Sequence, residues 1–179
     1  FSCNPSIESL FSFLITISSA FAADLTITSA TGNTGSTIDP GNTVTGTFDI
    51  KNDAGVQLTN IVFTLSLSSG SNTIPQSSIT FNPNTISLTA NETKNVVFTI
   101  NTNQVQAPGT YIGNLKIDYK KNNTSMSINN ALSFSLDINQ KIDLLVIPSP
   151  ITVNAQIDKL TTKTFTIQNT GNIALTNLN

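Results

Sequence analysis

Residues 44–67 read VTGTFDIKNDAGVQLTNIVFTLSL, and this stretch sets the expectation for the whole chain. In 44–50 and again in 61–67, apolar residues or glycine stand at every second position. A period of two residues is typical of β-strands that bury one face and expose the other. The polar segment between the two runs contains Asp53 and Gly55, residue types that favour turns. The stretch therefore predicts two antiparallel strands joined by a turn.

The same alternation recurs further along the chain, in residues 96–100, 111–119 and 132–138. Segments rich in turn-forming residues separate the runs: Asp39–Asn42, Ser68–Asn72, Asn82–Asn84, Pro108–Gly109 and Lys121–Asn123. About seven strands divided by such turns are typical of a two-sheet sandwich. We therefore expect an all-β fold from residue 24 onward, an immunoglobulin-like antiparallel β-sandwich.

The composition excludes several classes of function. The chain has 179 residues, with 8 lysines and 10 acidic residues, and it contains no histidine, arginine or tryptophan. Without histidine there is no Ser-His-Asp triad and no histidine-bound zinc or haem. Without arginine, and with a net charge of -2, nucleic acid is not an expected partner. One cysteine and two glutamates leave few groups for other chemistry, so we expect no catalytic residue, no cofactor and no metal.

Threonine, asparagine and serine together make up 70 of the 179 residues, while charged residues make up only 10%. A charged fraction near 25% is usual for soluble domains. We therefore expect a polar surface that is largely uncharged. Asp137 and Asp143, near the middle of the second half of the chain, are an alternative calcium site, although no D-x-D-x-D-G loop is present.

An apolar run of 13 residues begins at residue 10 and reads LFSFLITISSAFA, shorter than the roughly 20 residues of a membrane-spanning helix. It ends in Ala20-Phe21-Ala22, the small-x-small pattern of a signal-peptidase site. We interpret residues 1–22 as part of a secretory signal helix that is cleaved before Ala23, which also removes Cys3. The alternatives are a buried helix of the mature fold or a retained pilin-like helix. The preferred interpretation makes the protein secreted, with a location outside the cell or on its surface.

An internal repeat divides the rest of the chain. Residues 47–61 read TFDIKNDAGVQLTNI and residues 164–178 read TFTIQNTGNIALTNL, with a constant offset of 117 and seven identical positions. Such a period indicates tandem modules. We expect an immunoglobulin-like domain over 23–140 and a truncated second copy over 141–179. That copy has too few strands to close a sandwich.

The repeated segment also predicts a turn. In both copies an alternating strand ends at an asparagine, Asn52 or Asn169, and the sequence Leu-Thr-Asn starts the next strand. The turn contains Gly55 in the first copy and Gly171 in the second, and we expect the glycine or an asparagine there to provide the positive φ that such a turn needs.

These motifs resemble a known group of proteins. The Asn–Gly turn before Leu-Thr-Asn is followed by LTANET at 88–93 and by PGTY at 108–111. Together they resemble the immunoglobulin-like repeats of archaeal S-layer-related and other prokaryotic cell-surface proteins, and they are similar to CARDB-type adhesion modules. The resemblance covers about residues 24–179. It implies a structural or adhesive role at the cell envelope, with no catalytic residues to carry over.

Few individual residues are candidates for a site. Tyr111 opens a strand after Pro108-Gly109-Thr110, where immunoglobulin-like folds use a tyrosine to tie a corner. Asn91, Asn122 and Asn123 begin N-x-Ser/Thr sequons at predicted turns, so they are candidate glycosylation sites. In a host that makes N-glycans we expect at least one of them to be used, but not both of the adjacent Asn122 and Asn123. Lys116, Lys120 and Lys121 are interpreted as a solvated strand edge, with an anionic polymer site as the alternative.

We therefore expect a non-enzymatic cell-surface protein built of tandem modules, an S-layer component, stalk or adhesin. Its expected partners are other copies of the module, envelope proteins or polysaccharides, with any anchor outside this chain. One alternative is an accessory binding module of a larger secreted enzyme. Another is a filament subunit that donates a strand to its neighbour. A free-standing secreted enzyme is the remaining alternative, which the lack of histidine disfavours.

Overall fold

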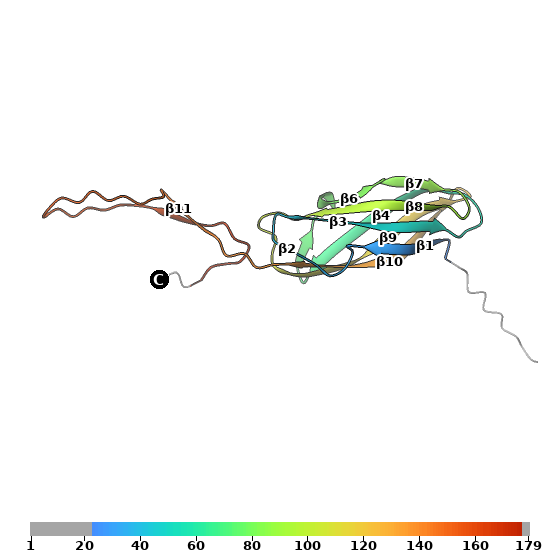
Figure 1. Ribbon diagram of the computed structural model, residues 1–179, viewed down its shortest axis with the longest axis horizontal. Coiled ribbons are helices and arrows are strands. Elements are labelled where there is room, and N and C mark those ends of the chain that lie inside the picture. Colours follow the sequence, from blue (N-terminus) through green and yellow to red (C-terminus); the bar gives the residue numbers. More distant parts are fainter. Residues whose placement is uncertain (1–22, 177–179) are drawn as a thin grey trace, which may run out of the picture.

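The computed structural model describes residues 23–176, and these are almost entirely β-structure (Figure 1). The predicted signal peptide, residues 1–22, lies outside the described residues. The strands are β1 (Leu25–Thr31), β2 (Ser36–Ile38), β3 (Thr43–Asn52), β4 (Leu58–Ser69), β5 (Asn72–Ile74), β6 (Ile79–Asn82), β7 (Thr85–Leu88), β8 (Thr93–Asn101), β9 (Gly109–Lys121), β10 (Thr124–Ile138), β11 (Leu144–Ile147) and β12 (Thr166–Asn169). A single 3-10 turn, Gln76–Ser78, leads into β6.

Two sheets form an immunoglobulin-like sandwich from the first ten strands. One sheet has the order β1-β3-β8-β6, and the other has the order β2-β10-β9-β4-β5, with β7 pairing with part of β4. Neighbouring strands are antiparallel, apart from β2 and β10, which are parallel. The first strand of the fold is divided between the sheets, and Gly32 (φ 71°) and Gly35 (φ 72°) lie in the crossing. The predicted fold class is confirmed.

The core lies between the two sheets and consists of the alternating apolar side chains that the sequence predicts. In β3, Val44, Gly46, Phe48 and Ile50 are buried, and the residues between them are exposed or half-buried. Phe98 from one sheet meets Phe134 from the other edge to face, with ring centroids 5.0 Å apart. Each fully buried side chain of this size stabilises the fold by roughly 1.5–3 kcal/mol. Burial of one face per strand therefore explains why the two sheets stack.

The lysine-rich segment is not an edge, so that prediction is wrong. Strand β9 carries Lys116, Lys120 and Lys121, and it lies inside its sheet between β4 and β10. The Lys116 ammonium lies 2.8 Å from Asp118, and the Lys121 ammonium lies 2.6 Å from Asp24. Alternation reports which face of a strand is buried, and it carries no information about which strands lie at the edges.

Beyond the sandwich, β11 and β12 form a two-stranded antiparallel ribbon that extends from one end of it (Figure 1). Leu144 pairs with Asn169 in this ribbon, as Leu25 pairs with Asn52 between β1 and β3. The ribbon thus repeats the pairing of the first two strands of the sandwich, with Asn169 in the place of Asn52, as the sequence repeat aligns them. Its side chains are exposed or half-buried, whereas Leu25 and every second residue of β3 are buried in the first copy.

Candidate functional site

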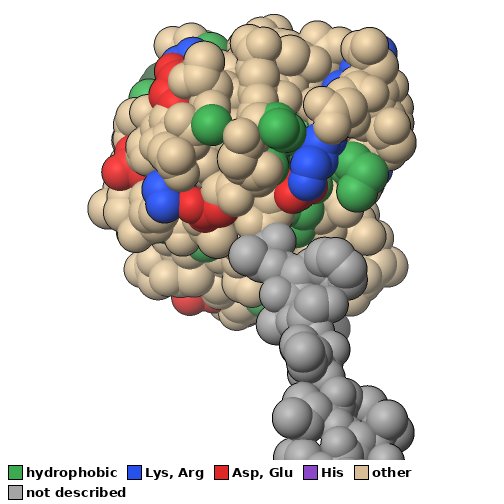
Figure 2. Space-filling view, turned by 90° about the vertical axis from the view of Figure 1, so that its right-hand side faces the viewer, with side chains coloured by type: hydrophobic (Ala, Val, Ile, Leu, Met, Phe, Trp, Pro, Cys, Tyr) green, Lys and Arg blue, Asp and Glu red, His purple; other side chains and the backbone are tan. Residues whose placement is uncertain are grey.

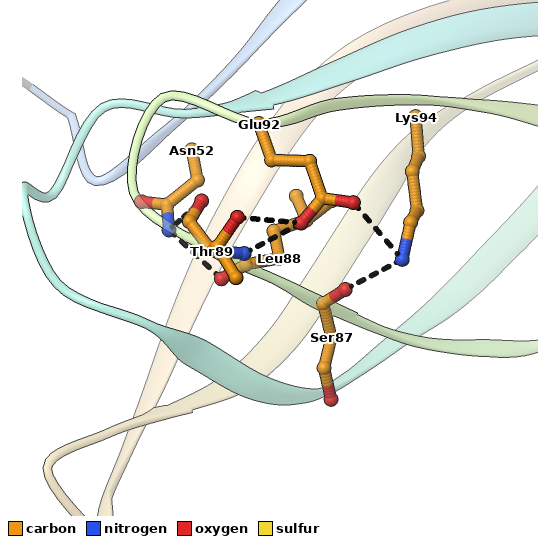
Figure 3. Close-up of polar contacts among 6 residues, drawn as sticks. All are labelled: Asn52, Ser87, Leu88, Thr89, Glu92 and Lys94. Carbon is orange, nitrogen blue, oxygen red and sulfur yellow. Dashed lines mark hydrogen bonds and ion pairs between the residues drawn. The ribbon is translucent and has the colours of Figure 1, made fainter.

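A buried polar cluster of the sandwich surrounds Asn52, at the end of β3 (Figure 3). Its side chain is fully buried, with 0% exposure. Its Nδ2 donates hydrogen bonds to the carbonyls of Val56 (2.8 Å), Leu88 (3.0 Å) and Thr89 (2.9 Å). Its Oδ1 accepts a hydrogen bond from the backbone N–H of Ala54 at 2.9 Å. One amide side chain therefore satisfies two separate turns, and a buried polar group of this kind needs such partners.

The second turn of this cluster is organised by Glu92. Its carboxylate accepts hydrogen bonds from the Thr89 backbone N–H (2.7 Å) and from the Thr89 hydroxyl (2.9 Å). Lys94 lies 3.3 Å from the other carboxylate oxygen and donates to the Ser87 carbonyl at 2.9 Å (Figure 3). The Thr89 N–H, the Thr89 hydroxyl and Lys94 together hold the pKa of Glu92 below its usual range. Glu92 therefore acts as a charged turn-closing group.

Glu92→Gln is expected to reduce the acid sensitivity of the fold. Because the pKa of Glu92 is lowered by folding, its ionised form stabilises the protein above the unfolded value of about 4.3, and this contribution is lost as the pH falls through the folded value. The wild type should therefore lose more stability than the variant between pH 7 and pH 3, measured as urea midpoints. Asp158→Asn, at an exposed loop position, controls for the change in net charge. Parallel losses in wild type and Glu92→Gln would contradict this assignment.

The same end of the sandwich carries further polar groups around Asp24. The Tyr119 hydroxyl donates to the Asp24 carboxylate at 2.9 Å, and the Lys121 ammonium lies 2.6 Å from its other oxygen. Burial, together with the negative charge of Asp24, raises the pKa of Tyr119 to about 12. Figure 2 views this end of the molecule and shows a surface that is mostly uncharged, on which acidic and lysine side chains lie next to one another in a few places. These pairs fasten β9 to the start of β1.

The three sequon asparagines lie in exposed turns. Asn91, between β7 and β8, has a φ of 63°, and its backbone N–H donates to the Asn52 carbonyl at 3.0 Å. Asn122 and Asn123 form the two-residue turn between β9 and β10, with φ values of 50° and 64°. Positive φ at both positions is typical of the tight hairpin turn that asparagine favours. All three side chains are exposed, so the structure leaves each one accessible.

At the opposite end, Tyr111 ties a corner. Its ring is fully buried, and its hydroxyl donates to the Ala107 carbonyl at 2.9 Å, four residues upstream. The same hydroxyl accepts a hydrogen bond from Gln106 Nε2 at 2.8 Å. Gln106 is itself buried and also donates to the Thr73 carbonyl at 3.2 Å. The tyrosine fixes the connection between β8 and β9, and Gln106 joins this corner to strand β5.

Tyr111→Phe is expected to destabilise the fold by about 1–2 kcal/mol, because it removes two hydrogen bonds and leaves Gln106 short of a partner. The measurement is urea unfolding followed by far-UV circular dichroism. The double variant Tyr111→Phe with Gln106→Leu tests whether the loss comes from the Gln106 amide that is left without the hydroxyl. If it does, the double variant should be more stable than Tyr111→Phe alone. If Tyr111→Phe alone lowers the free energy of unfolding by less than about 0.3 kcal/mol, the Tyr111 hydroxyl does not stabilise this corner.

The ribbon is attached to this end of the sandwich by Asn172. Its Nδ2 donates to the Gln106 carbonyl at 2.9 Å and to the Asn139 carbonyl at 2.8 Å. Its Oδ1 accepts from the Lys141 N–H at 2.6 Å. Sequence reasoning did not identify Gln106 or Asn172. A signal was present, because the repeat places Asn172 opposite Gly55, where the first copy has no side chain.

The two predicted turn glycines have different roles. Gly55 has a φ of 70° and open space where a Cβ would lie, as expected for a turn that needs positive φ. Gly171 is not among the positive-φ glycines of the described residues, so the prediction for it is wrong. A Cβ at Gly171 would lie 2.2 Å from the Lys141 carbonyl oxygen. Gly171 is needed because the backbone of Lys141 and Asp143 packs against it. The offset of 117 in fact aligns Gly171 with Ala54, and not with Gly55.

The asparagine turn itself recurs in the second copy. Asn169 Nδ2 donates to the Ile173 carbonyl at 2.8 Å, and its Oδ1 accepts from the Gly171 N–H at 3.0 Å. These bonds match those of Asn52 with Val56 and Ala54. The backbone contact from Thr170 N–H to the Asp143 carbonyl likewise matches the contact from Asp53 to Asp24. The two copies thus share the strand pairing, the turn and the side-chain hydrogen bonds within that turn.

Two open hollows lie on the sheet that contains β9. One, of about 340 Å³, is lined by Asn60, Asp118, Tyr119, Lys120, Ser125, Met126 and Ser127. The other, of about 490 Å³, is lined by Ile112, Gly113, Asn114, Ser133 and Phe134. Over residues 23–176, no three His, Cys, Asp or Glu side chains come together as a metal site would require. No helix in that same part of the chain has the length and apolar character needed to cross a bilayer.

Comparisons with known proteins concern the fold. No protein-family model and no curated protein matches the chain. Among solved structures, a family 123 glycoside hydrolase from Clostridium perfringens matches at 12% identity and a TM-score of 0.48, over 60% of this chain and 23% of the hydrolase chain. A CARDB domain from Pyrococcus furiosus matches at 16% identity and a TM-score of 0.39, over 64% of this chain and 94% of that chain. The E. coli chaperone DraB matches at 9% identity and a TM-score of 0.41, over 64% of this chain and 53% of the chaperone chain. All three TM-scores are below 0.5, so the fold assignment rests on the strand order of the two sheets.

Proposed function

We propose that this chain is a non-enzymatic structural or adhesive protein of the cell surface, built of tandem immunoglobulin-like modules in the manner of S-layer-related proteins or stalks. The observation that carries the proposal is the repetition of the Asn52 turn at Asn169, with the same register over three residue pairs and the same two side-chain hydrogen bonds within the turn. Modules that repeat at this level of detail are typical of linear arrays.

The charged groups support a role without catalysis. The carboxyl groups of Asp49, Asp53, Glu92 and Asp118 all have their pKa lowered, by hydrogen bonds from Asn95, Lys51, Thr89 and Lys116 respectively as the leading cause. General acids and bases work best with a pKa near the operating pH. These carboxylates stay ionised and act as partners for neighbouring donors.

The composition of the surface supports an extracellular location. Lysines 51, 94, 116, 121 and 141 each lie within 4 Å of an acidic group, and the rest of the polar surface comes largely from threonine, serine and asparagine. Exposed pairs of this kind contribute little stability, so the sandwich depends on its core. The signal-like residues 1–22 and the resemblance to surface repeats favour the same location.

The test is the location of the protein on intact cells. Antibodies raised against the chain should label the outer surface of unpermeabilised cells of the source organism in immunogold micrographs, and external protease should remove the label. The polypeptide recovered from the envelope should begin at Ala23. Label that appears only after permeabilisation would reject the proposal. A recovered polypeptide that hydrolyses polysaccharide in a gel overlay would instead favour the accessory-module alternative.

A further inference from the structure

The ribbon of β11 and β12 exposes side chains whose repeat partners are buried in the sandwich. Phe165 and Ile167 are 46% and 49% exposed, whereas the corresponding Phe48 and Ile50 are both 0% exposed. Leu144 is 44% exposed, against 4% for Leu25. Three successive residue pairs match between the two copies. The difference in exposure therefore comes from the strands that cover the first copy and that have no counterpart over the ribbon within residues 23–176.

The amide of Asn169 shows which segment is lacking. In the first copy, Asn52 Nδ2 donates to Val56 within its own turn and also to the carbonyls of Leu88 and Thr89. Asn169 Nδ2 makes the first of these bonds, to Ile173, and within residues 23–176 it has no counterpart of the other two. Leu88 and Thr89 belong to the turn between β7 and β8.

The backbone of β12 points to the same segment. In the sandwich, β3 pairs with β1 on one side and with β8 on the other. In the ribbon, β12 pairs with β11, and no described strand pairs with its other edge. An open edge beside an apolar face is a template for adding one more strand.

We propose that the ribbon is the acceptor half of a second sandwich, and that its occupant is a segment of the β7–turn–β8 type. This segment carries a Leu-Thr-x-x-Glu turn, whose two leading carbonyls bond to the Asn169 amide, and an alternating strand that pairs antiparallel with β12. The inference rests on the proposed tandem arrangement and adds to it the identity of the docking segment.

The register follows from the first copy. There, Phe48 lies opposite Val96 and Ile50 lies opposite Lys94. A docked segment therefore places its equivalent of Val96 opposite Phe165 and its equivalent of Lys94 opposite Ile167. Val96, Phe98 and Ile100 alternate along β8 and are all buried, so such a strand presents one apolar face to the ribbon. The docked segment would cover the exposed side chains of Phe165 and Ile167, and its turn would accept hydrogen bonds from the Asn169 amide. An apolar partner without this turn would not form those hydrogen bonds.

The experiment supplies this segment in a fusion. Residues 85–101, TISLTANETKNVVFTIN, are appended after Asn179 through a Gly/Ser linker of about 20 residues, whose average span is about 25 Å. Tethering gives an effective concentration in the millimolar range, so weak docking is detectable. Amide hydrogen exchange at 166–169 is expected to slow by about tenfold or more compared with a fusion that carries the linker alone.

Two matched variants decide whether the docking is the one proposed. Asn169→Ala should remove most of the protection, by about tenfold, because two hydrogen bonds of the docked turn are lost. Val96→Asp and Phe98→Asp in the appended copy should abolish it. Unchanged exchange at 166–169, protection that survives all of these substitutions, or protection confined to β1 or β6 would each overturn the proposal. Surface labelling of cells does not depend on hydrogen exchange in the fusion. The proposed cell-surface location and the proposed docking can therefore be rejected separately.

Discussion

Asn52→Ala is expected to lower the free energy of unfolding by about 3–4 kcal/mol, one of the two largest effects of any substitution considered for this protein. The variant removes four hydrogen bonds made by one buried side chain and leaves the carbonyls of Leu88 and Thr89 and the N–H of Ala54 without that partner. Each buried backbone group left unsatisfied costs about 1–3 kcal/mol. Urea unfolding followed by circular dichroism measures the loss.

The repeat provides the matched control. Asn169→Ala removes the same amide from the same kind of turn, but Asn169 is exposed and water can replace its bonds. The expected loss is below about 0.5 kcal/mol. A loss of similar size in the two variants would show that the turn alone, and not the bridge to the turn between β7 and β8, determines the effect.

Phe48→Ala is expected to cost about 3–5 kcal/mol, the usual range for truncation of a buried phenylalanine. The Phe48 ring packs edge to face against Phe63, with centroids 5.4 Å apart, and against Phe81, with centroids 6.4 Å apart. These three rings come from both sheets, so the variant opens a cavity at the interface between them. Thermal or urea unfolding measures the loss, together with an increase in binding of a hydrophobic dye.

Phe165→Ala is the control for this substitution. Phe165 occupies the repeat position of Phe48 but is 46% exposed, so its removal should change the unfolding free energy of the sandwich by less than about 0.5 kcal/mol. If the acceptor proposal holds, the same substitution in the fusion with residues 85–101 should destabilise the docked segment. A cost for Phe165→Ala as large as that for Phe48→Ala would mean that the ribbon is already packed in a core.

The sequence alone determined the pattern of the sandwich. Period-two alternation identified the buried face of each long strand, because side chains of a strand point to opposite sides in turn. In β3 and β4 every core residue predicted from alternation is buried, among them Phe48, Ile50, Ile61 and Leu65. The offset of 117 also identified the repeated strand and turn, since the same residues make the same local hydrogen bonds in both copies.

Only the tertiary structure decided how these parts combine. Strand order placed β9 inside its sheet, which the lysines at 116, 120 and 121 did not reveal. Contacts between distant segments gave Asn52, Gln106 and Asn172 their roles, because each donates to carbonyls that lie far away in the sequence. A glycine is needed at 171 because the backbone of Lys141 and Asp143 lies too close for a Cβ, and not because the turn requires a positive φ. Local pattern specifies which face of a strand is apolar, whereas the choice of neighbour is made by packing between residues tens of positions apart.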